Sequence, residues 1–198
     1  MKNIGFRYRR KVAPYGSSRL FLGEDEDVLM SSLKGKWRNM LKKSLKSGID
    51  IKHYNGNSCN ILKIIDRYKS FQKDKGFSGV SSELLLRLSK EEESKQWRFC
   101  YLCAITNKNK ILGELVSIEH GSSATYFIGM TNYSEKSLNV NYALIWHSLL
   151  IAKSNGCKYY DTGGINQNTT DGIARFKKGL NGYEYSLIGE YYLSWLKR

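Results

Sequence analysis

Three consecutive strand-like runs constrain the fold of this chain more than any other feature of the sequence. They cover residues 97–106, 111–120 and 124–131, and they are rich in apolar, β-branched and aromatic residues. The turns between them, residues 107–110 and 121–123, are short enough to form hairpins. The sequence therefore predicts an antiparallel meander of three strands.

A helix follows the meander and leads into a further strand. Residues 138–154 carry apolar side chains at helical spacing, with Tyr142, Ile145, Leu149 and Ala152 expected on the inner face, and residues 158–161 form a brief strand. Because a crossover helix joins parallel strands, the sheet is predicted to be mixed, with helices on its faces. A short helix over 171–178 and a closing strand over 183–191 complete the pattern.

The first half of the chain is predicted to be mainly helical. Residues 49–54 alternate as a short strand, and helices are expected over 60–73 and 81–95. Before them, an acidic start at 24–27 and a lysine-rich end predict a long helix over 24–47. Its expected apolar stripe has a residue at every fourth position: Leu29, Leu33, Trp37, Leu41 and Leu45. Its cations lie off that stripe: Lys34, Lys36, Arg38, Lys42, Lys43 and Lys46.

The predicted order is β-α-α-β-β-β-α-β-α-β, preceded by this basic amphipathic helix, which is an α/β architecture with a mixed sheet. The 198 residues suffice for one domain, and we expect a basic N-terminal segment over 1–23, with a short strand near 19–22, and a single domain over 24–198. No run approaches the roughly 18 apolar residues of a membrane-spanning helix. The start of the chain also lacks the apolar stretch of a signal peptide, so we expect a cytoplasmic protein.

The chain is strongly basic, with 32 Lys and Arg against 18 Asp and Glu and a net charge of +14. Such a charge favours polyanionic partners, among them tRNA, nucleotide diphosphates and an anionic membrane face. A basic surface that only confers solubility fits the same charge.

The spacing of cysteines and histidines predicts no metal site. Cys100 and Cys103 form a C-x-x-C pair, but they lie in a predicted strand, where residues three apart face opposite sides of the sheet. With Cys59 and Cys157 they are expected to be reduced and mostly buried thiols. No metal-ligand spacing joins the three histidines, which are His53, His120 and His147.

Three stretches resemble the FemABX-like aminoacyltransferases, which are relatives of the GNAT acyltransferases. KGKWRNMLKKS at 34–44 with GIDI at 48–51 resembles the basic helix and first strand of Fem-type domains, and NVNYALIW at 139–146 resembles the start of their crossover helix. YDTGGI at 160–165, GIARFKKG at 172–179 and GEY at 189–191 are similar to their C-terminal signature. The order and spacing hold from about residue 19 to the end, and the predicted element order is that of the GNAT fold.

This resemblance implies a cleft between two splayed strands, here residues 124–131 and 158–161. It implies transfer of an amino acid from aminoacyl-tRNA to an amine, typically in a peptidoglycan precursor, with a nucleotide-diphosphate or lipid-linked acceptor and no bound cofactor. Two alternatives stay open: an acyl-CoA-dependent N-acyltransferase acting on an amino sugar or amino acid, and a non-catalytic RNA- or nucleotide-binding module. Residues 132–141 lack the glycine-rich pyrophosphate loop of acetyl-CoA-dependent GNAT proteins, which favours the tRNA donor. Characterised Fem enzymes have two GNAT-like domains, whereas this chain has room for one, which resembles the second.

The resemblance also implies roles for particular residues. Lys177 of the Phe-Lys motif is expected in the active cleft, where an ammonium group stabilises the oxyanion formed during transfer, with Phe176 as its packing partner. Arg38, with Lys36 beside it, is a candidate contact for the nucleotide diphosphate of the acceptor.

Further candidates come from the residues themselves. Asp161 either binds substrate or accepts a proton from the amine, or its carboxylate holds the backbone N–H groups of the glycine turn after it. Gly163 and Gly164 are expected to permit close backbone approach or a positive φ in the cleft. Tyr126 and Tyr142 either line the cleft or belong to the core.

Overall fold

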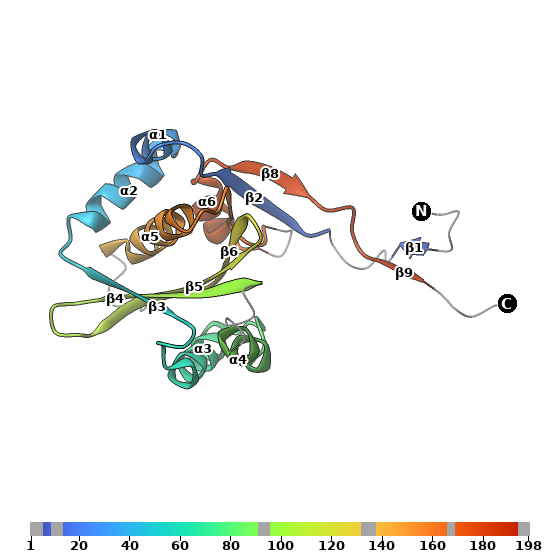
Figure 1. Ribbon diagram of the computed structural model, residues 1–198, viewed down its shortest axis with the longest axis horizontal. Coiled ribbons are helices and arrows are strands. Elements are labelled where there is room, and N and C mark those ends of the chain that lie inside the picture. Colours follow the sequence, from blue (N-terminus) through green and yellow to red (C-terminus); the bar gives the residue numbers. More distant parts are fainter. Residues whose placement is uncertain (1–5, 9–13, 91–95, 132–137, 166–168, 194–198) are drawn as a thin grey trace.

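A seven-stranded mixed sheet organises the computed structural model, which describes residues 6–8, 14–90, 96–131, 138–165 and 169–193 (Figure 1). The strands of this sheet are β2 (Gly16–Phe21), β3 (Asp50–Asn55), β4 (Trp97–Ile105), β5 (Ile111–His120), β6 (Ser123–Thr131), β7 (Tyr159–Asp161) and β8 (Tyr183–Ser186). Their order is β3-β4-β5-β6-β7-β2-β8, and all neighbours are antiparallel except β6 and β7, which are parallel. The predicted meander and the parallel strand after the crossover helix are both present.

Helices cover both faces of the sheet (Figure 1). On one face lie α1 (Glu26–Ser32), α2 (Gly35–Leu45) and α5 (Val140–Ser154), and on the other lie α3 (Ile61–Lys75) and α4 (Ser82–Lys90). The short helix α6 (Asp171–Lys178) contacts α2 through the rings of Phe176 and Trp37. The mixed α/β class predicted from the sequence is confirmed.

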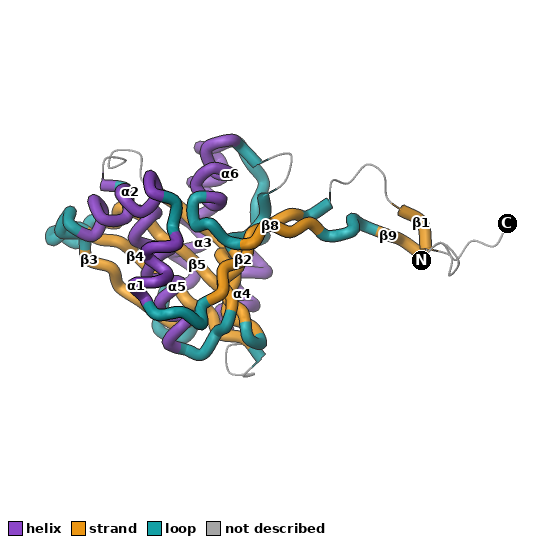
Figure 2. The backbone as a smooth tube through the Cα atoms, turned by 90° about the horizontal axis from the view of Figure 1, so that it is seen from above, coloured by secondary structure: helices purple, strands orange, loops and turns teal. Residues whose placement is uncertain are grey.

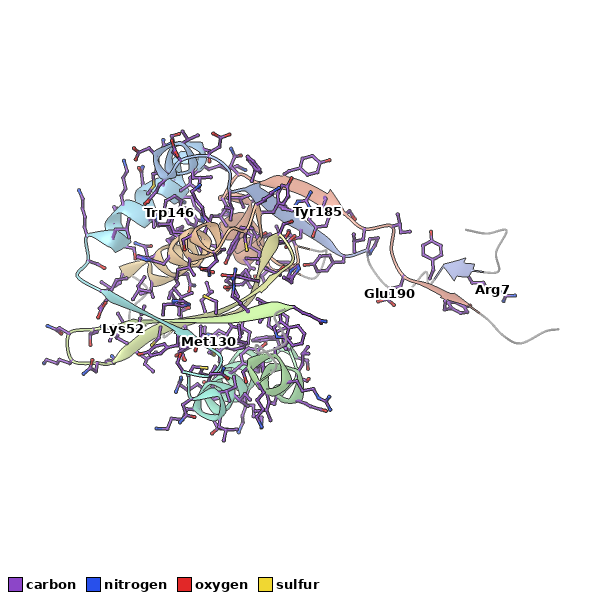
Figure 3. The ribbon with its side chains drawn as sticks, in the orientation of Figure 1. Arg7, Lys52, Met130, Trp146, Tyr185 and Glu190 are labelled. Carbon is purple, nitrogen blue, oxygen red and sulfur yellow. The ribbon has the colours of Figure 1, made fainter. Side chains whose placement is uncertain are left out.

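The sheet separates two hydrophobic cores (Figure 3). Trp146 of α5 lies in the core on one face, and Met130 of β6 lies in the core on the other. Along β4 the side chains alternate between the two, so that Cys100 belongs to the α5 core and Cys103 to the α3 core. The C-x-x-C pair thus faces opposite sides of the sheet, as predicted.

The long helix predicted over 24–47 is wrong, because the chain forms α1 and α2 with a break between them. Leu33 and Lys34 are extended, with ψ of 144° and 137°, and the Lys34 N–H donates to the Gly179 carbonyl at 3.0 Å. A straight helix advances by 400° over four residues, so an every-fourth stripe drifts by about 40° at each step. The break lets Leu33 and Leu41 both enter the core, and the drift along α2 leaves Leu45 44% exposed.

The closing strand predicted over 183–191 is two strands, β8 and β9 (Tyr191–Leu193). Between them Gly189 has a φ of +95°, which side chains other than hydrogen rarely allow. β9 pairs with β1 (Phe6–Tyr8) in a two-stranded ribbon that extends away from the main sheet (Figure 2).

Two further expectations need adjustment. The short strand near 19–22 is part of β2, which lies inside the sheet between β7 and β8. In α4, the apolar spacing of the predicted helix over 81–95 places Leu84 on the inner face with Leu85, but Leu85 is fully buried while Leu84 is 43% exposed. The end of this predicted helix, residues 91–95, lies outside the described residues. The division of the chain at residue 23 remains a prediction.

Candidate functional site

The candidate site lies where β6 and β7 part. The two strands pair only from Ser123 with Tyr159 to Thr125 with Asp161. The register of β5 with β6 shifts at this point, because Ser117 pairs with Tyr126 while Val116 pairs with Ile128. The extra residue on β6 is a β-bulge, which bends a strand locally. The pairing of β6 with β7 therefore ends next to a bulge at Tyr126.

Asp161 ends β7 and is held on both carboxylate oxygens. Its Oδ1 accepts hydrogen bonds from the Ser17 hydroxyl at 2.5 Å and from the Gly163 N–H at 2.8 Å, and its Oδ2 accepts one from the Tyr185 hydroxyl at 2.6 Å. The residue is only 7% exposed. The bond to the N–H two residues on is the Asx-turn contact predicted for this position.

Glycine is required at position 163. Its φ is +72°, and a Cβ built there would lie 2.6 Å from the carbonyl oxygen of Tyr126. At Gly164, by contrast, φ is not positive, and a Cβ would meet a ring carbon of Tyr15 at 3.3 Å. The predicted positive φ and close approach therefore belong to Gly163, while Gly164 is tight against an aromatic ring.

Lys177 is a buried lysine in the last turn of α6, with 8% exposure. Its Nζ donates to the Gly164 carbonyl at 2.9 Å and lies 5.3 Å from the centroid of the Tyr126 ring. Burial lowers the pKa of Lys177 to about 8, against a smaller opposing effect of the Asp161 carboxylate. Burial also raises the pKa of the Tyr126 hydroxyl. The sequence pattern alone would place a lysine of a Lys-Lys pair at a helix end in solvent, whereas the fold places this one inside.

Phe176, the residue before Lys177, forms an aromatic cluster with Tyr142 and Trp37. The Tyr142 and Phe176 rings meet edge to face at 5.0 Å, and the Trp37 ring lies 5.0 Å from Tyr142 and 5.9 Å from Phe176. Three elements, α2, α5 and α6, meet here. The cluster therefore fixes the helix that carries Lys177 against the body of the domain.

Lys36 and Arg38 do not contact the polar groups around Asp161 and Lys177. Lys36 is exposed on α2, and Arg38 is half-buried and donates from Nη1 to the Ser31 carbonyl at 2.6 Å. That contact bridges the break between α1 and α2. Of the predicted residues, the fold gathers Lys177, Asp161, Gly163, Gly164 and Tyr126 around one turn.

Sequence reasoning missed Ser17, Tyr15 and Tyr185, which surround Asp161. Burial and the Asp161 hydrogen bond raise the pKa of Tyr185 to about 12, and burial followed by the Asp161 charge raises the pKa of Tyr15. Ser17 and Tyr185 are cross-strand partners in β2 and β8. No local pattern marks them, because their role depends on which strands are neighbours.

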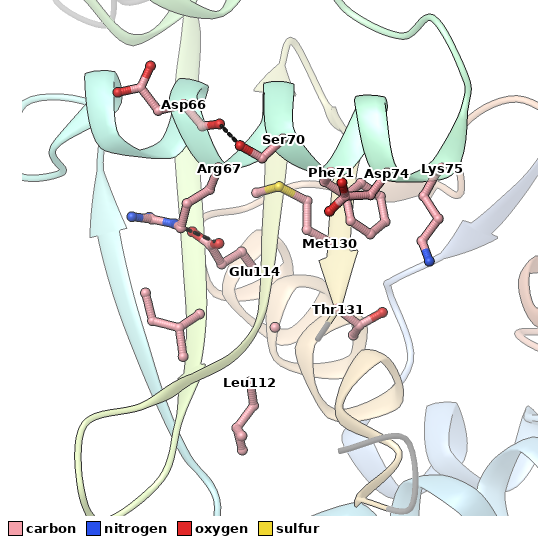
Figure 4. A pocket seen from close by; sticks show the side chains of 12 residues that line it. Asp66, Arg67, Ser70, Phe71, Asp74, Lys75, Leu112, Glu114, Met130 and Thr131 are labelled. Carbon is pink, nitrogen blue, oxygen red and sulfur yellow. Dashed lines mark hydrogen bonds and ion pairs between the residues drawn. The ribbon is translucent and has the colours of Figure 1, made fainter. Parts of the chain in front are cut away.

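A separate hollow of about 620 Å³ lies between α3 and the ends of β5 and β6 (Figure 4). Glu114, 4% exposed, accepts hydrogen bonds there from Arg67, at 2.6 to 3.0 Å, and from the Tyr101 hydroxyl, at 2.6 Å. None of the residues predicted as a site lines this hollow. It lies on the α3 side of the sheet, away from the core that contacts Phe176.

The described part of the chain holds no group of three or more His, Cys, Asp or Glu side chains that could bind a metal ion. Among the same residues, no helix is both long enough and apolar enough to cross a membrane.

The described structure is a mixed sheet with helices on both faces and a buried lysine close to the end of the β6–β7 pairing. A model of the FemAB family matches residues 87–197, more than half of the sequence, and the chain belongs to that family. The predicted fold and family are thereby confirmed. No curated protein matches the sequence.

Solved structures share this fold at low sequence identity. The crystal structure of FemX matches with a TM-score of 0.75 and 14% identity, over 96% of this chain and 66% of FemX. The C-terminal domain of a putative lysylphosphatidylglycerol synthetase from Agrobacterium fabrum matches with a TM-score of 0.61 and 9% identity, over 93% of this chain and 61% of that one. A tandem GNAT protein from the clavulanic acid biosynthesis pathway matches with a TM-score of 0.58 and 9% identity, over 93% and 55%. The chain thus spans about two thirds or less of these structures.

Proposed function

We propose that this chain is an N-acyltransferase that forms an amide bond, and that it transfers an amino acid from aminoacyl-tRNA to an amine of a peptidoglycan precursor or a related envelope component. Membership of the FemAB family supports the reaction class. The observation that carries the proposal is the buried ammonium group of Lys177, fixed at the Gly164 carbonyl just after β7.

The proposed reaction is direct aminolysis. The acceptor nitrogen attacks the ester carbonyl carbon of the donor, whose oxygen becomes an oxyanion in the tetrahedral intermediate. Collapse forms the amide C–N bond and breaks the ester C–O bond, and the leaving tRNA hydroxyl receives the proton that the amine loses. Lys177 keeps its proton and stabilises the oxyanion, an interaction that is strong in a site with little water.

The position of the Lys177 side chain suits this role. An ammonium group has three N–H bonds, and within the described residues the Gly164 carbonyl accepts one of them. In the proposed reaction the other two N–H bonds donate to the substrate oxygen while the side chain stays bound to Gly164. Since the pKa of Lys177 is about 8, we expect transfer to fall as the pH rises through 8 and the ammonium group is lost.

The charge of the chain supports the tRNA donor, because a net charge of +14 attracts a polyanion from a distance. With a donor of this kind the reaction takes place in the cytoplasm. The nucleotide-diphosphate and lipid-linked forms of the acceptor both present phosphate, and Lys36 and Arg38 on α2 are the proposed contacts.

A donor assay with a matched pair of lysine variants tests the proposal. The protein is incubated with charged tRNA and an amine acceptor, and in parallel with labelled acetyl-CoA. We expect consumption of the charged tRNA, and a loss of roughly two to three orders of magnitude for Lys177→Ala. The control is Lys178→Ala, because Lys178 is the next residue of α6 and pairs at the surface with Glu184 at 2.7 Å.

Three outcomes would contradict the proposal. Consumption of acetyl-CoA alone would assign the acyl-CoA-dependent reaction instead. Binding of tRNA without turnover by any variant would assign a non-catalytic RNA-binding module. Equal turnover by Lys177→Ala and Lys178→Ala would remove Lys177 from the reaction.

A further inference from the structure

The buried carboxylate of Asp161 accepts hydrogen bonds from other groups of the protein. Three donors, the Ser17 hydroxyl, the Gly163 N–H and the Tyr185 hydroxyl, approach it at 2.5, 2.8 and 2.6 Å. A carboxylate offers about four lone-pair directions, so three of them are used inside the fold. This arrangement suits a group that holds backbone in place more than one that takes a proton from a substrate.

Strand register explains why these side chains meet. Ser17 pairs with Tyr185 across β2 and β8, and Arg19 pairs with Asp161 across β2 and β7. Ser17 and Arg19 are two residues apart and share one face of β2, so Ser17, Tyr185 and Asp161 emerge on the same face. Three strands that are distant in sequence thus deliver one hydrogen-bonded group.

That group fixes the turn that anchors the lysine. The Gly163 N–H is bound by Asp161, and the Gly163 carbonyl accepts the Ser17 hydroxyl at 2.9 Å. Both peptide groups of Gly163, a residue with φ of +72°, are therefore fixed. The next carbonyl, that of Gly164, accepts the Lys177 ammonium at 2.9 Å.

We propose that Ser17 and Tyr185 are positioning residues for Lys177, and that they act through Asp161 and the Gly163–Gly164 turn. Asp161 is then also a positioning residue and not the proton acceptor. This inference rests on the proposed function, in which Lys177 stabilises the oxyanion. Loss of either hydroxyl loosens the turn, lets water reach Nζ and moves the ammonium group away from its place.

The test uses Tyr185→Phe and Ser17→Ala in the full chain, with Tyr183→Phe as the matched control. Tyr183 lies two residues away on β8 and is 76% exposed. We expect kcat to fall about ten- to hundredfold in both test variants with KM within about twofold, because positioning is lost while substrate binding is kept. The control is expected to keep the kcat of the unmodified chain.

A second measurement needs no substrate. In protein labelled with ¹⁵N-lysine, the Nζ resonance of Lys177, identified by its absence in Lys177→Ala, is followed against pH. The groups that face this ammonium are the Asp161 carboxylate, itself bound by Tyr185, and the Tyr126 ring. Water entry favours the charged form, so Tyr185→Phe and Ser17→Ala are expected to raise the titration midpoint above about 8, toward the ordinary 10.5.

The two measurements separate the failures. A lower melting temperature with unchanged kcat and an unchanged midpoint would show a merely structural role and overturn the inference. If Lys177→Ala retains full transfer, the proposed role of Lys177 in the reaction fails, while a raised midpoint in Tyr185→Phe still supports the positioning of the lysine. If Asp161→Asn lost far more kcat than Tyr185→Phe at an unchanged midpoint, Asp161 would be a proton acceptor and the inference would be wrong.

Discussion

Lys177 is a lysine that the fold buries at a cost to stability. A lysine with 8% exposure has lost most of its water, and one carbonyl acceptor replaces only part of that hydration. The folded-state pKa of about 8 against the ordinary 10.5 expresses this cost. Below pH 8 both folded and unfolded chains carry the charge, so the penalty is fully present.

We therefore expect Lys177→Met to abolish transfer and to stabilise the fold. The pKa difference corresponds to roughly 3 kcal/mol, and the lost hydrogen bond to Gly164 offsets about 1 kcal/mol, which leaves a gain of about 2 kcal/mol at pH 7. The folded chain binds fewer protons than the unfolded chain between pH 8 and 10.5, so the gain relative to the unmodified chain shrinks over that window. Urea unfolding of both proteins at pH 7 and pH 10 measures the difference in unfolding free energy at each pH. A destabilised variant at pH 7 would contradict the expectation.

Gly163 carries the second prediction at this scale. Gly163→Ala adds a Cβ 2.6 Å from the Tyr126 carbonyl oxygen at a φ of +72°, whereas Gly76→Ala adds one at +64° with nothing within 4 Å. Gly76→Ala is the control, and it should lose only the roughly 1 kcal/mol that a left-handed backbone conformation costs a residue with a Cβ. Gly163→Ala is expected to lose at least about 2 kcal/mol and most activity, because β6 and the turn are forced apart. Equal losses of unfolding free energy in the two variants would refute the clash.

At the scale of elements, the break between α1 and α2 decides which face of α2 is buried. The N–H of Lys34, the last residue of the break, donates to the carbonyl of Gly179, the residue after α6. This hydrogen bond attaches the start of α2 to the end of the helix that carries Lys177. Trp37, 3% exposed, then packs on Phe176. The lysines Lys36, Lys42 and Lys43 of α2 are exposed.

Arg38→Ala tests both the hydrogen bond across the break and the proposed contact of Arg38 with phosphate. The lost bond to the Ser31 carbonyl is at the surface, so the unfolding free energy should fall by no more than about 1 kcal/mol. If Arg38 also binds phosphate, the affinity for charged tRNA should fall, and the slope of log K against log salt should decrease by about one unit. Lys52→Ala is the comparison, because Lys52 is an exposed cation on β3 paired with Asp50 at 2.7 Å. An unchanged affinity and an unchanged slope would leave Arg38 with its structural role alone.

At the scale of the whole molecule, α3 and α4 pack on one face of the sheet and share no core with the helices on the other face. The contacts that attach this layer to the sheet can therefore be considered by themselves. Arg67 of α3 forms an ion pair with Glu114 of β5, and the Tyr101 hydroxyl of β4 donates a hydrogen bond to the same carboxylate. The carboxylate is 4% exposed, while the Arg67 side chain is 36% exposed. The pair therefore joins a layer of helices to the middle of the sheet.

Glu114→Ala is expected to cost about 2–3 kcal/mol, because it removes a buried partner of two groups while Arg67 can regain water. Glu83→Ala breaks an exposed pair with Arg87 on α4 and should change the unfolding free energy by less than about 0.5 kcal/mol. Urea denaturation of both variants measures the difference. A Glu114→Ala loss as small as that of the control would show that the α3 layer is held by its apolar core alone.

The sequence by itself determined the family and most of the local elements, apart from the break between α1 and α2 and the division of the closing strand. The runs of the meander, the helix over 171–178 and the opposite faces of Cys100 and Cys103 follow from hydrophobic periodicity, which depends on neighbouring residues only. Lys177, Asp161 and the glycine turn were found because they lie in a short contiguous signature. Their roles remain predictions.

Only the tertiary structure decided what surrounds that turn. Ser17 and Asp161 are 144 residues apart, and they meet because β2 is placed between β7 and β8, an order that no local pattern encodes. The break before α2 and the burial of Lys177 have the same origin. Each depends on contact with a distant surface, and the free energy of that contact outweighs the local preference for a continuous helix or a solvated lysine.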